Sequence, residues 1–416
     1  MAVAGVSDVV VVGGGPAGFT AAVFAARRGL SVTLLEKGQK PLRKLRITGK
    51  GRCNLTNNCT DEEFFQNVLR GAKFLRSSER AFGPQDIMQF FEQLGVPLKT
   101  ERGRRVFPQS DRAMDIVNAL LGEAERCGVR LVQARADGIL CEDGRVCGVV
   151  SGGELYRCRA AVLATGGLSY PATGSDGDGF KMVQKLGHSV TDCSPSLVPL
   201  RCEEPWCREL EGLSLKNVAL RCKQGKKTLF DEQGELMFTA DGITGPLALS
   251  LSAVLAGKEL PAAVSIDLKP ALDAEQLDKR LLRDFGEAPN RAFKNSLGEL
   301  LPRSIIPVVV RLCGIDGEKR LNVLTAAERR RLGELLKRLP LTVVGNHGWN
   351  EAVVTAGGVA LKEVDPKTMQ SKLVQGLYLT GEMLDADAYT GGYNLTIAFC
   401  TGAAAGNAVL QEDTEQ

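Results

Sequence analysis

The 416-residue sequence predicts an α/β fold in which helices cover a parallel sheet, and its N-terminal segment is the main reason. Residues 9–12 are four valines in a row, which is typical of a parallel strand buried on both faces. They run directly into a G-x-G-x-x-G motif at residues 13–18, an alanine-rich helix, and a second apolar run at residues 31–35 that ends at Glu36. A strand, a glycine-rich turn, a helix and a second strand in this order predict a unit that binds a dinucleotide.

Each part of this unit has a mechanical role. Gly13 permits the tight turn, Gly15 lets the backbone approach a pyrophosphate, and Gly18 lets the helix pack closely on the strand. The helix N-terminus offers free N–H groups to that pyrophosphate, and Glu36 stands where an acidic side chain binds ribose hydroxyls. The residues of this unit that we expect to contact the cofactor are Gly13, Gly15, Pro16, Ala17, Gly18, Glu36 and Lys37.

Two further segments identify which dinucleotide is bound. Residues 376–406 comprise an apolar strand, a Gly-Glu pair, a loop and a small-residue helix, and residues 160–179 contain a strand that ends in Thr-Gly-Gly. Together with the N-terminal unit they resemble the FAD site of glutathione-reductase-like flavoproteins. The resemblance implies FAD rather than NAD, with the last helix directed at the flavin N1/O2 edge. It also implies cofactor contacts from Ala136, Thr165, Gly166, Gly381, Glu382, Asp385, Gly392, Tyr393 and Asn394.

The composition agrees with an enzyme of the cytoplasm. The net charge is only +3, no apolar run is long enough to span a bilayer, and the first strand begins too early to leave room for a signal peptide. The twelve cysteines form no C-x-x-C pair, which is typical of reduced thiols and disfavours an electron relay through a disulfide. The presence of only two histidines disfavours both a histidine-rich metal site and catalysis by a histidine base, and we expect no metal.

The three flavoprotein-like segments define the expected domain organisation. Residues 1–195 form the first part of the FAD-binding domain, and residues 350–416 complete it, because their strand must return to the same sheet. Residues 196–270 contain short β-like runs, and residues 271–349 contain amphipathic helical stretches with a returning strand. We expect this insertion to line the substrate side. Residues 60–130 look largely helical, and a β meander is expected from Arg130 to Val150.

A family becomes recognisable in three more segments. These are KLRITGKGRCNLTN at residues 44–57, GELMFTADGITGPLALSLS at residues 234–252, and the stretch from residue 352 to 385. They resemble the YhiN/BaiN-like flavoproteins, also known as aminoacetone-oxidase-like FAD-binding enzymes. The resemblance implies a Rossmann domain with an inserted β-barrel-like domain and a helical subdomain. It also implies chemistry of three kinds: reduction of conjugated double bonds in 3-oxo bile acids, dihydrouridine formation in ribosomal RNA, and amine oxidation.

The loop at residues 49–57 resembles the flavin-side loop of that family. Residues expected to contact the cofactor here are Lys44, Gly51, Arg52 and Asn54. Arg52 is suited to a phosphate or an anionic substrate. Cys53 is either a proton donor or a small buried filler, and Asn54 either bonds the flavin or forms a turn. Tyr170 and Tyr393 are the other candidate proton donors, with a packed aromatic as the alternative for each.

The sequence contains no second strand–GxGxxG–helix unit and no dithiol, so we expect direct hydride exchange between flavin N5 and a substrate carbon. NAD(P)H is then a transient reductant without a Rossmann site of its own. The leading function is reduction of an activated C=C bond in a small molecule, such as a 3-oxo-Δ4/Δ6 bile acid.

Basic clusters make RNA an alternative substrate. Cations without acids among them are Lys40, Arg43, Lys44, Arg46, Lys50 and Arg52, followed later by Arg102, Arg104 and Arg105. If these basic residues lie on one face of the molecule, they would bind phosphates. The low aromatic content of 5% disfavours a platform for base stacking. A ribosomal RNA dihydrouridine synthase, an amine oxidase and a non-catalytic flavin-binding protein therefore remain as alternatives, and the oligomeric state stays open.

Overall fold

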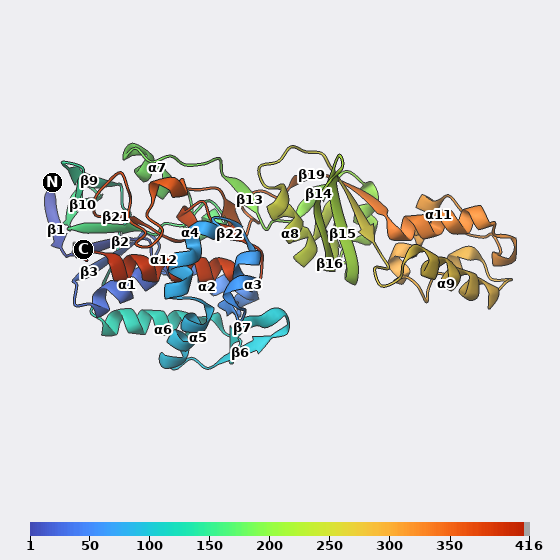
Figure 1. Cartoon of the computed structure of the whole chain (residues 1–416), viewed down its shortest axis with the longest axis horizontal. Helices are drawn as coiled ribbons and strands as arrows, with labels where there is room; N and C mark the ends of the chain where they lie inside the picture. Colours follow the sequence, from blue (N-terminus) through green and yellow to red (C-terminus); the bar gives the residue numbers. More distant parts are fainter. Residues whose placement is uncertain (412–416) are drawn as a thin grey trace. The chain divides into compact units, whose positions relative to one another are not determined.

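The computed structural model describes residues 1–411, and the chain forms two compact units (Figure 1). One consists of Met1–Ser196 together with the chain from Trp349 onward, and the other of Leu197–Gly348. None of the helices in residues 1–411 is long and apolar enough to cross a membrane.

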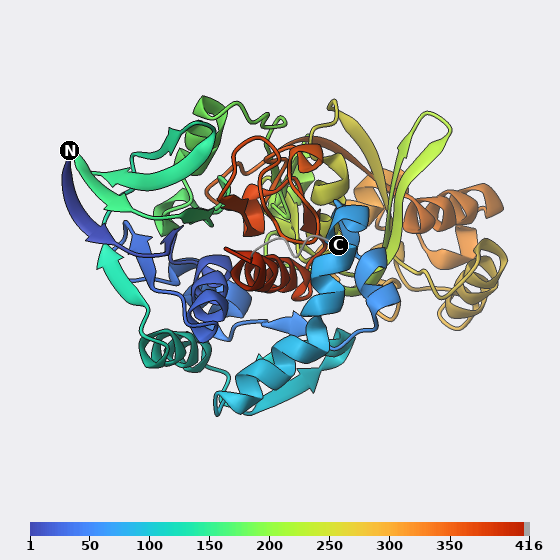
Figure 2. The same cartoon turned by 60° about the vertical axis from the view of Figure 1, so that its left-hand side comes forward.

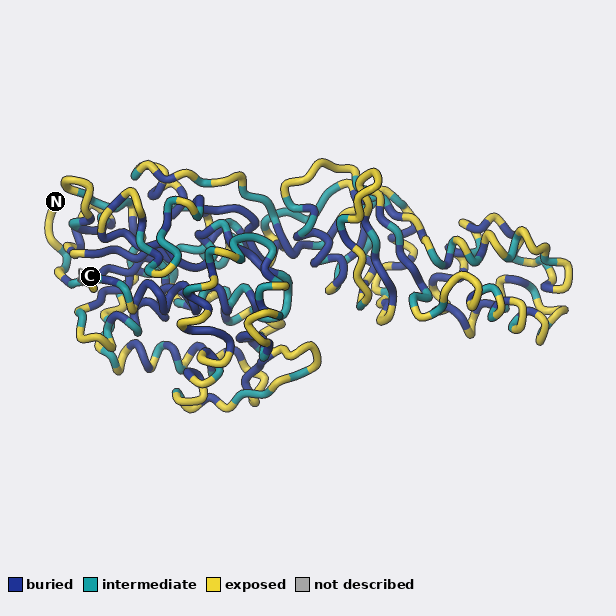
Figure 3. The backbone as a smooth tube through the Cα atoms, in the orientation of Figure 1, coloured by how far each residue is buried: buried dark blue, intermediate teal, exposed yellow. Residues whose placement is uncertain are grey.

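A five-stranded parallel sheet forms the centre of the first unit, which confirms the predicted fold class. Its order is β21 (Leu377–Leu379), β12 (Ala160–Leu163), β2 (Val9–Val12), β3 (Val32–Glu36) and β8 (Arg130–Gln133). The valines of β2 are almost entirely buried, because strands flank them on both sides and helices cover the sheet. Figure 3 shows this core as the dark blue centre of the unit.

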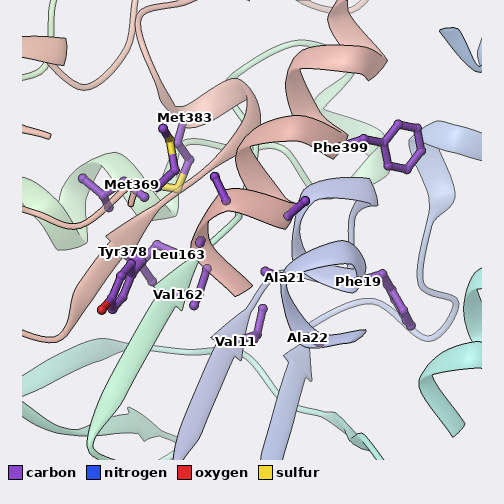
Figure 4. Packing of buried hydrophobic residues seen from close by; sticks show 14 of the residues in the cluster. Val11, Phe19, Ala21, Ala22, Val162, Leu163, Met369, Tyr378, Met383 and Phe399 are labelled. Carbon is purple, nitrogen blue, oxygen red and sulfur yellow. The ribbon is translucent and has the colours of Figure 1, made fainter. Parts of the chain in front are cut away.

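Two helices from opposite ends of the chain lie against each other beside this sheet. They are α1 (Pro16–Arg27) and α12 (Tyr393–Ala408), drawn in dark blue and red in Figure 2. The approach is close because a Cβ atom at Gly402 would lie 2.4 Å from the Ala17 carbonyl oxygen. Figure 4 shows side chains of both helices in one core with Val11 and Val162 of the sheet.

Residues 60–130 are mostly helical, as expected, except for a β-hairpin and the short strand β5 (Val68–Arg70). The helices are α3 (Asp61–Gln66), α4 (Ala72–Ala81), α5 (Pro84–Gln93) and α6 (Ala113–Arg126), preceded by α2 (Arg43–Ile47). The strands β6 (Leu98–Glu101) and β7 (Arg105–Pro108) form the hairpin and pair with β4 (Thr56–Asn57). The pairing of β7 explains the difference, because its residues Arg105 and Val106 pair with both β6 and β4, and the hairpin turns at Gly103 with a φ of 73°.

The meander expected from Arg130 to Val150 is only partly formed. Its first strand, β8, joins the parallel sheet, whereas β9 (Gly138–Glu142) and β10 (Arg145–Ser151) form a hairpin through Asp143 and Gly144, both with positive φ. This hairpin belongs to a separate sheet with β11 (Glu154–Arg157) and β1 (Ala2–Val6). Further elements of the unit are α7 (Asp178–Lys185), β13 (Ser194–Ser196), β20 (Val354–Ala356), β5 (Val68–Arg70) and β22 (Asp387–Ala388).

One buried carboxyl group of this unit has no partner. Glu79, on α4, is 1% exposed, and neither of its side-chain oxygens has a hydrogen-bond partner within the described residues. Burial raises the pKa of Glu79 to about 7, with a further contribution from the charge of Asp61. Nearby Arg80 acts in the opposite direction without forming an ion pair with it in the described chain.

The second unit is a closed barrel with a helical part between two of its strands. The barrel order is β14 (Leu200–Cys202), β17 (Gly242–Thr244), β16 (Lys227–Thr239), β15 (Ser214–Gln224), β18 (Ala262–Asp267) and β19 (Leu339–Asn346). Helix α8 (Pro246–Leu255) follows β17, and α9 (Ala274–Gly286), α10 (Ile306–Cys313) and α11 (Ala326–Lys337) follow β18 (Figure 1). Asp273 and Thr325 begin α9 and α11 with capping boxes, as their sequences favour.

Candidate active site

The glycine turn after β2 has the shape of a dinucleotide cradle. A Cβ atom at Gly13, whose φ is 104°, would lie 2.5 Å from the carbonyl oxygen of Ala164, and one at Gly18 would lie 1.9 Å from the Gly13 carbonyl oxygen. Neither position therefore accepts a side chain. At Gly15 the only neighbouring atom is the Ala164 oxygen at 4.0 Å, so a side chain there would occupy otherwise open space. This is the space that a pyrophosphate needs.

The start of α1 is suited to an anion. Gly15 is its N-cap and provides no side-chain cap, Pro16 occupies the first turn, and that turn contains no acidic residue. Free N–H groups and the positive end of the helix dipole therefore face the space beside Gly15. Ala17 is buried, with 5% exposure, where α1 meets α12. The residues present fit the pyrophosphate of FAD.

Glu36 lies at the carboxyl end of β3 beside this turn. Its Oε2 accepts a hydrogen bond from the Gly14 N–H at 2.7 Å, and its Oε1 accepts one from the Gly38 N–H at 2.6 Å. The carboxylate therefore holds the glycine turn and the following loop together, and each oxygen keeps capacity for a further donor such as a ribose hydroxyl.

Lys37 is bound to the acidic loop after β12. Its Nζ lies 2.6 Å from Asp176 and 3.2 Å from Asp178, and Arg135 also pairs with Asp178, at 2.6 Å. Two cations thus neutralise the acids of this loop beside the glycine turn. Ala136, next to Arg135, is 6% exposed in the connection between β8 and β9.

The ends of β12 and β21 bring a second set of polar residues to the same edge of the sheet. Thr165 and Gly166 follow β12, and Gly381 and Glu382 follow β21. Glu382 pairs with Lys44 of α2, with 2.7 Å between Oε2 and Nζ. Segments that are far apart in the sequence therefore meet beside the glycine turn, as expected for parallel strands whose carboxyl ends share one edge.

The loop at residues 48–57 packs on the start of α12. With its amide oriented so that both neighbouring backbone groups are satisfied, the Asn54 side chain accepts a hydrogen bond from the Gly392 N–H at 3.0 Å and donates one to the Thr56 carbonyl at 3.2 Å. A Cβ atom at Gly392 would lie 2.3 Å from that carbonyl oxygen. Asn57 donates to the carbonyl of Gly391 at 3.0 Å, and Thr56 bonds Thr396 through their hydroxyls.

The backbone of this loop is unusual. Gly49, Lys50, Gly51 and Cys53 all have positive φ, and two of them are not glycine. Such conformations cost roughly 1 kcal/mol or more for a residue with a side chain and persist where surrounding contacts impose them. Here the Cys53 N–H donates to the Thr48 carbonyl at 3.0 Å, which closes the loop.

The loop before α12 is held by the helix itself. The Asn394 amide accepts from the Ala388 N–H at 2.9 Å and donates to the carbonyls of Ala388 and Tyr389. Asn394 therefore organises this loop, which also contains Asp385, one oxygen of which is buried without a partner among residues 1–411. Gly392 provides no side-chain cap and the first turn of α12 has no acid, so the helix N-terminus suits negative charge.

Arg52 is engaged by two carboxylates. Its guanidinium lies 2.5 Å from Glu101 and 2.5 Å from Asp111, and stacks 4.2 Å from the centre of the Phe107 ring. The hydrogen bond from Arg52 lowers the pKa of Glu101. This pairing makes Arg52 a support of the loop on the β6–β7 hairpin, and its predicted contact with the cofactor stays a prediction.

The three candidate proton donors differ in access. Cys53 is completely buried, and burial raises the pKa of its thiol to about 12. Tyr393 is 8% exposed, packs near Phe64, and burial raises its pKa to about 12 as well. Tyr170 is half-buried and has a left-handed backbone with φ 47°, fixed by its N–H donating to the Trp349 carbonyl. Of the three, Tyr170 is the most accessible to a substrate.

Sequence reasoning assigned no role to Ser169, Thr355, Thr56 and Asn57. All four are polar and almost fully buried: Ser169 and Thr355 bond Glu382, whereas Thr56 bonds Thr396 and Asn57 bonds the carbonyl of Gly391. Their signal in the sequence was their place inside the flavoprotein-like segments, whereas their burial depends on contacts between distant segments. No group of three or more metal-ligating side chains suited to a metal ion occurs in residues 1–411.

Comparison with known proteins agrees with this geometry. Residues 7–408 match the family described as HI0933-like protein Rossmann domain. The chain is 31% identical over 410 residues to 3-dehydro-bile acid delta(4,6)-reductase of Clostridium scindens, covering 96% of this chain and 98% of the relative. It is 30% identical over 393 residues to ribosomal RNA dihydrouridine synthase of Escherichia coli, covering 94% and 95%.

A solved structure of similar fold is 3-ketosteroid delta1-dehydrogenase from Sterolibacterium denitrificans, in complex with 1,4-androstadiene-3,17-dione. Its TM-score is 0.51 at 15% identity, and the match covers 97% of this chain and 99% of that one. At this identity the likeness concerns the fold alone.

Proposed function

This chain belongs to the HI0933-like family and is an FAD-dependent oxidoreductase, and on that premise we propose that it reduces an activated C=C bond in a small molecule. The substrate class is an enone, such as a 3-oxo-Δ4/Δ6 bile acid. The observation that carries the proposal is the match, over nearly the full length of both chains, to an enzyme named for that reaction.

Different residues of the chain would bind different parts of FAD. Bound FAD would supply a hydride from N5 to the β carbon of the enone. The Gly13–Gly18 turn and the start of α1 would hold the pyrophosphate, and Glu36 would bind the ribose. The uncapped N-terminus of α12 would stabilise negative charge on the ring. NAD(P)H is the proposed reductant, docking transiently because the chain has a single glycine-rich nucleotide motif.

Tyr170 is the proposed proton donor to the α carbon. This role is supported by its position next to Ser169, whose hydroxyl donates to Glu382 after β21. Its exposure favours it over Cys53, whose thiol is shielded from any bound molecule. A positioned general acid contributes about 10²-fold or more to the rate.

Anaerobic reoxidation tests the reaction. The reduced protein is mixed with a 3-oxo-Δ4,6 steroid, a uridine-containing ribosomal RNA fragment, or oxygen, and flavin absorbance is followed. We expect the steroid to reoxidise it fastest and to gain two hydrogens. Tyr170→Phe should slow this step about 10²-fold while Cys53→Ala leaves it unchanged. Reoxidation by oxygen alone would refute the proposal, and reduction of the oxidised protein by an amine would favour an amine oxidase.

Ribosomal RNA is the second candidate substrate, because part of the predicted basic cluster is not neutralised. Of this cluster, Lys44, Arg52 and Arg104 form ion pairs. By contrast, five exposed cations near the loop form none within the described chain: Lys40, Arg43, Lys50, Arg102 and Arg105. Such a surface suits phosphates, and one relative is named for RNA dihydrouridine synthesis.

Salt distinguishes the two substrates. Affinity for an RNA fragment governed by phosphate contacts should fall steeply between low and physiological salt, whereas affinity for a neutral steroid should hardly change. Replacing Lys50 and Arg105 with Gln should weaken only the binding of RNA. Salt-insensitive RNA binding, or none, would remove this candidate.

A further inference from the structure

Two buried polar residues beside Glu382 have no role in the function proposed above. Ser169 follows β12 and is 0% exposed, and Thr355, in β20, is 1% exposed. Burying a hydroxyl is costly unless it is hydrogen-bonded, so the partners of these two groups indicate what they do.

Both residues bind the same carboxylate oxygen. Glu382 Oε1 accepts from the Ser169 hydroxyl at 2.5 Å and from the Thr355 N–H at 2.9 Å. Glu382 Oε2 accepts from Lys44 Nζ at 2.7 Å, and Lys44 also donates to the Ser169 hydroxyl oxygen at 2.8 Å. Ser169 thus lies between the two charged groups and fixes both.

The Thr355 hydroxyl shapes the turn that carries Ser169. Its Oγ1 accepts from the N–H of Leu168 at 2.8 Å and from that of Ser169 at 3.2 Å. A Cβ atom at Gly167 would lie 2.3 Å from this Oγ1 and 3.2 Å from Glu382 Oε1. The second glycine of the Thr-Gly-Gly motif is therefore required because the Thr355 hydroxyl occupies the space of a side chain.

The charged pair spans the cofactor edge of the sheet. Lys44 lies on α2, shortly after β3, and Glu382 follows β21 at the other side of β12 and β2. The glycine turn follows β2, one of the two strands between β21 and β3, and it bonds the start of α2, since the Leu42 N–H donates to the Gly14 carbonyl at 2.8 Å. The two charged groups therefore come from opposite sides of the strand that carries the cradle and meet at 2.7 Å.

We propose that Thr355 and Ser169 are positioning residues that aim Glu382 and Lys44 at the ribityl and phosphate part of FAD. Two donors occupy Oε1, so Oε2 keeps the acceptor capacity, and Lys44 keeps one of its three N–H donors. One acceptor beside one donor matches a polyol hydroxyl, which both donates and accepts. This inference rests on FAD binding and not on the identity of the substrate.

The test measures FAD binding to the apo-protein by titration, without any substrate. Thr355→Val removes the hydroxyl at nearly constant volume and should weaken FAD binding at least tenfold, whereas Thr355→Ser should stay within about threefold of wild type. Ser169→Ala should resemble Thr355→Val. The matched control is Ser371→Ala, which removes another buried hydroxyl that accepts from two backbone N–H groups but binds His188 instead of Glu382.

A double-mutant cycle separates positioning from general damage. If Thr355 acts through Glu382, then Thr355→Val should cost less than about twofold in FAD affinity once Glu382→Gln is present. Wild-type affinity in Thr355→Val, an equal loss in Ser371→Ala, or additive effects in the double variant would overturn the inference. Absence of FAD binding by the wild-type protein would instead refute the proposed function itself.

Discussion

The two walls of the proposed cofactor site are built in different ways. The glycine turn and α1 come from one stretch of chain, Gly13 to Glu36, whose own contacts include the close approach of Gly18 to Gly13 and the hydrogen bond from Gly14 to Glu36. The opposite wall joins the loop at residues 48–57 to the start of α12, more than 330 residues later. A local wall depends on backbone conformation, whereas an assembled wall depends on long-range packing, so substitutions should affect them differently.

The largest effect is expected in the local wall. Gly15→Val places a branched side chain in the open space beside the N-terminus of α1, where a pyrophosphate would lie. FAD retention should fall by at least about 100-fold, measured by flavin absorbance of the purified protein, because the clash removes the anion contacts. Since no protein atom fills that space, the thermal stability of the apo-protein should stay close to wild type. Full FAD occupancy in this variant would show that the turn does not bind the cofactor.

In the assembled wall, the corresponding change should destabilise the fold first. Gly392→Ala forces a Cβ atom within 2.3 Å of the Thr56 carbonyl at a φ of 103°. Such a combination of overlap and backbone strain should lower the free energy of unfolding by about 3 kcal/mol or more, measured in urea on the apo-protein. Gly51→Ala is the control, since Gly51 has positive φ but no atom near its Cβ position. Similar losses of stability in Gly392→Ala and Gly51→Ala would mean that the positive φ alone, and not the overlap with Thr56, causes the effect.

A smaller loss is expected from the side chain that joins the two segments. Asn54→Ala removes the acceptor of the Gly392 N–H and the donor to the Thr56 carbonyl. Two neutral hydrogen bonds of this kind are worth about 1–2 kcal/mol together, so the melting temperature of the apo-protein should fall by a few degrees. Asn54→Asp should recover part of the loss because it keeps the acceptor. No change in either variant would mean that the two segments are held by packing alone.

The same contrast explains which parts of the molecule were predictable. The glycine turn, Glu36 and the parallel strands follow a pattern within one short stretch, and the fold class was predicted from it. The hairpin at residues 98–108, inside the stretch 60–130 that was expected to be largely helical, was not predicted, because its pairing with β4 is invisible in local periodicity. The partners of Arg52 and the cluster around Glu382 combine residues from separate segments, and no spacing in the sequence encodes their meeting. The one hint of the Glu382 cluster in the sequence was a polar residue, Thr355, within an apolar stretch.

Glu79 makes folding of the first unit a proton-binding reaction. Its pKa is about 7 in the folded chain and about 4.5 in the unfolded chain, so the folded state holds more protons between these values. Its contribution is therefore most favourable below pH 4.5 and is lost as the pH rises toward 7. Burial lowers the pKa of His188, which acts in the opposite direction over an overlapping interval. The difference between wild type and Glu79→Gln isolates the carboxyl group.

The variant should thus gain stability relative to wild type when unfolding is measured at pH 8, and little at pH 4.5, in urea titrations at both values. An equal difference at the two pH values would mean that Glu79 releases no proton in this interval. The stability of α4 would then be independent of pH in this range. If the expected result holds, the pH of the solution controls the stability of the helix that packs against α12.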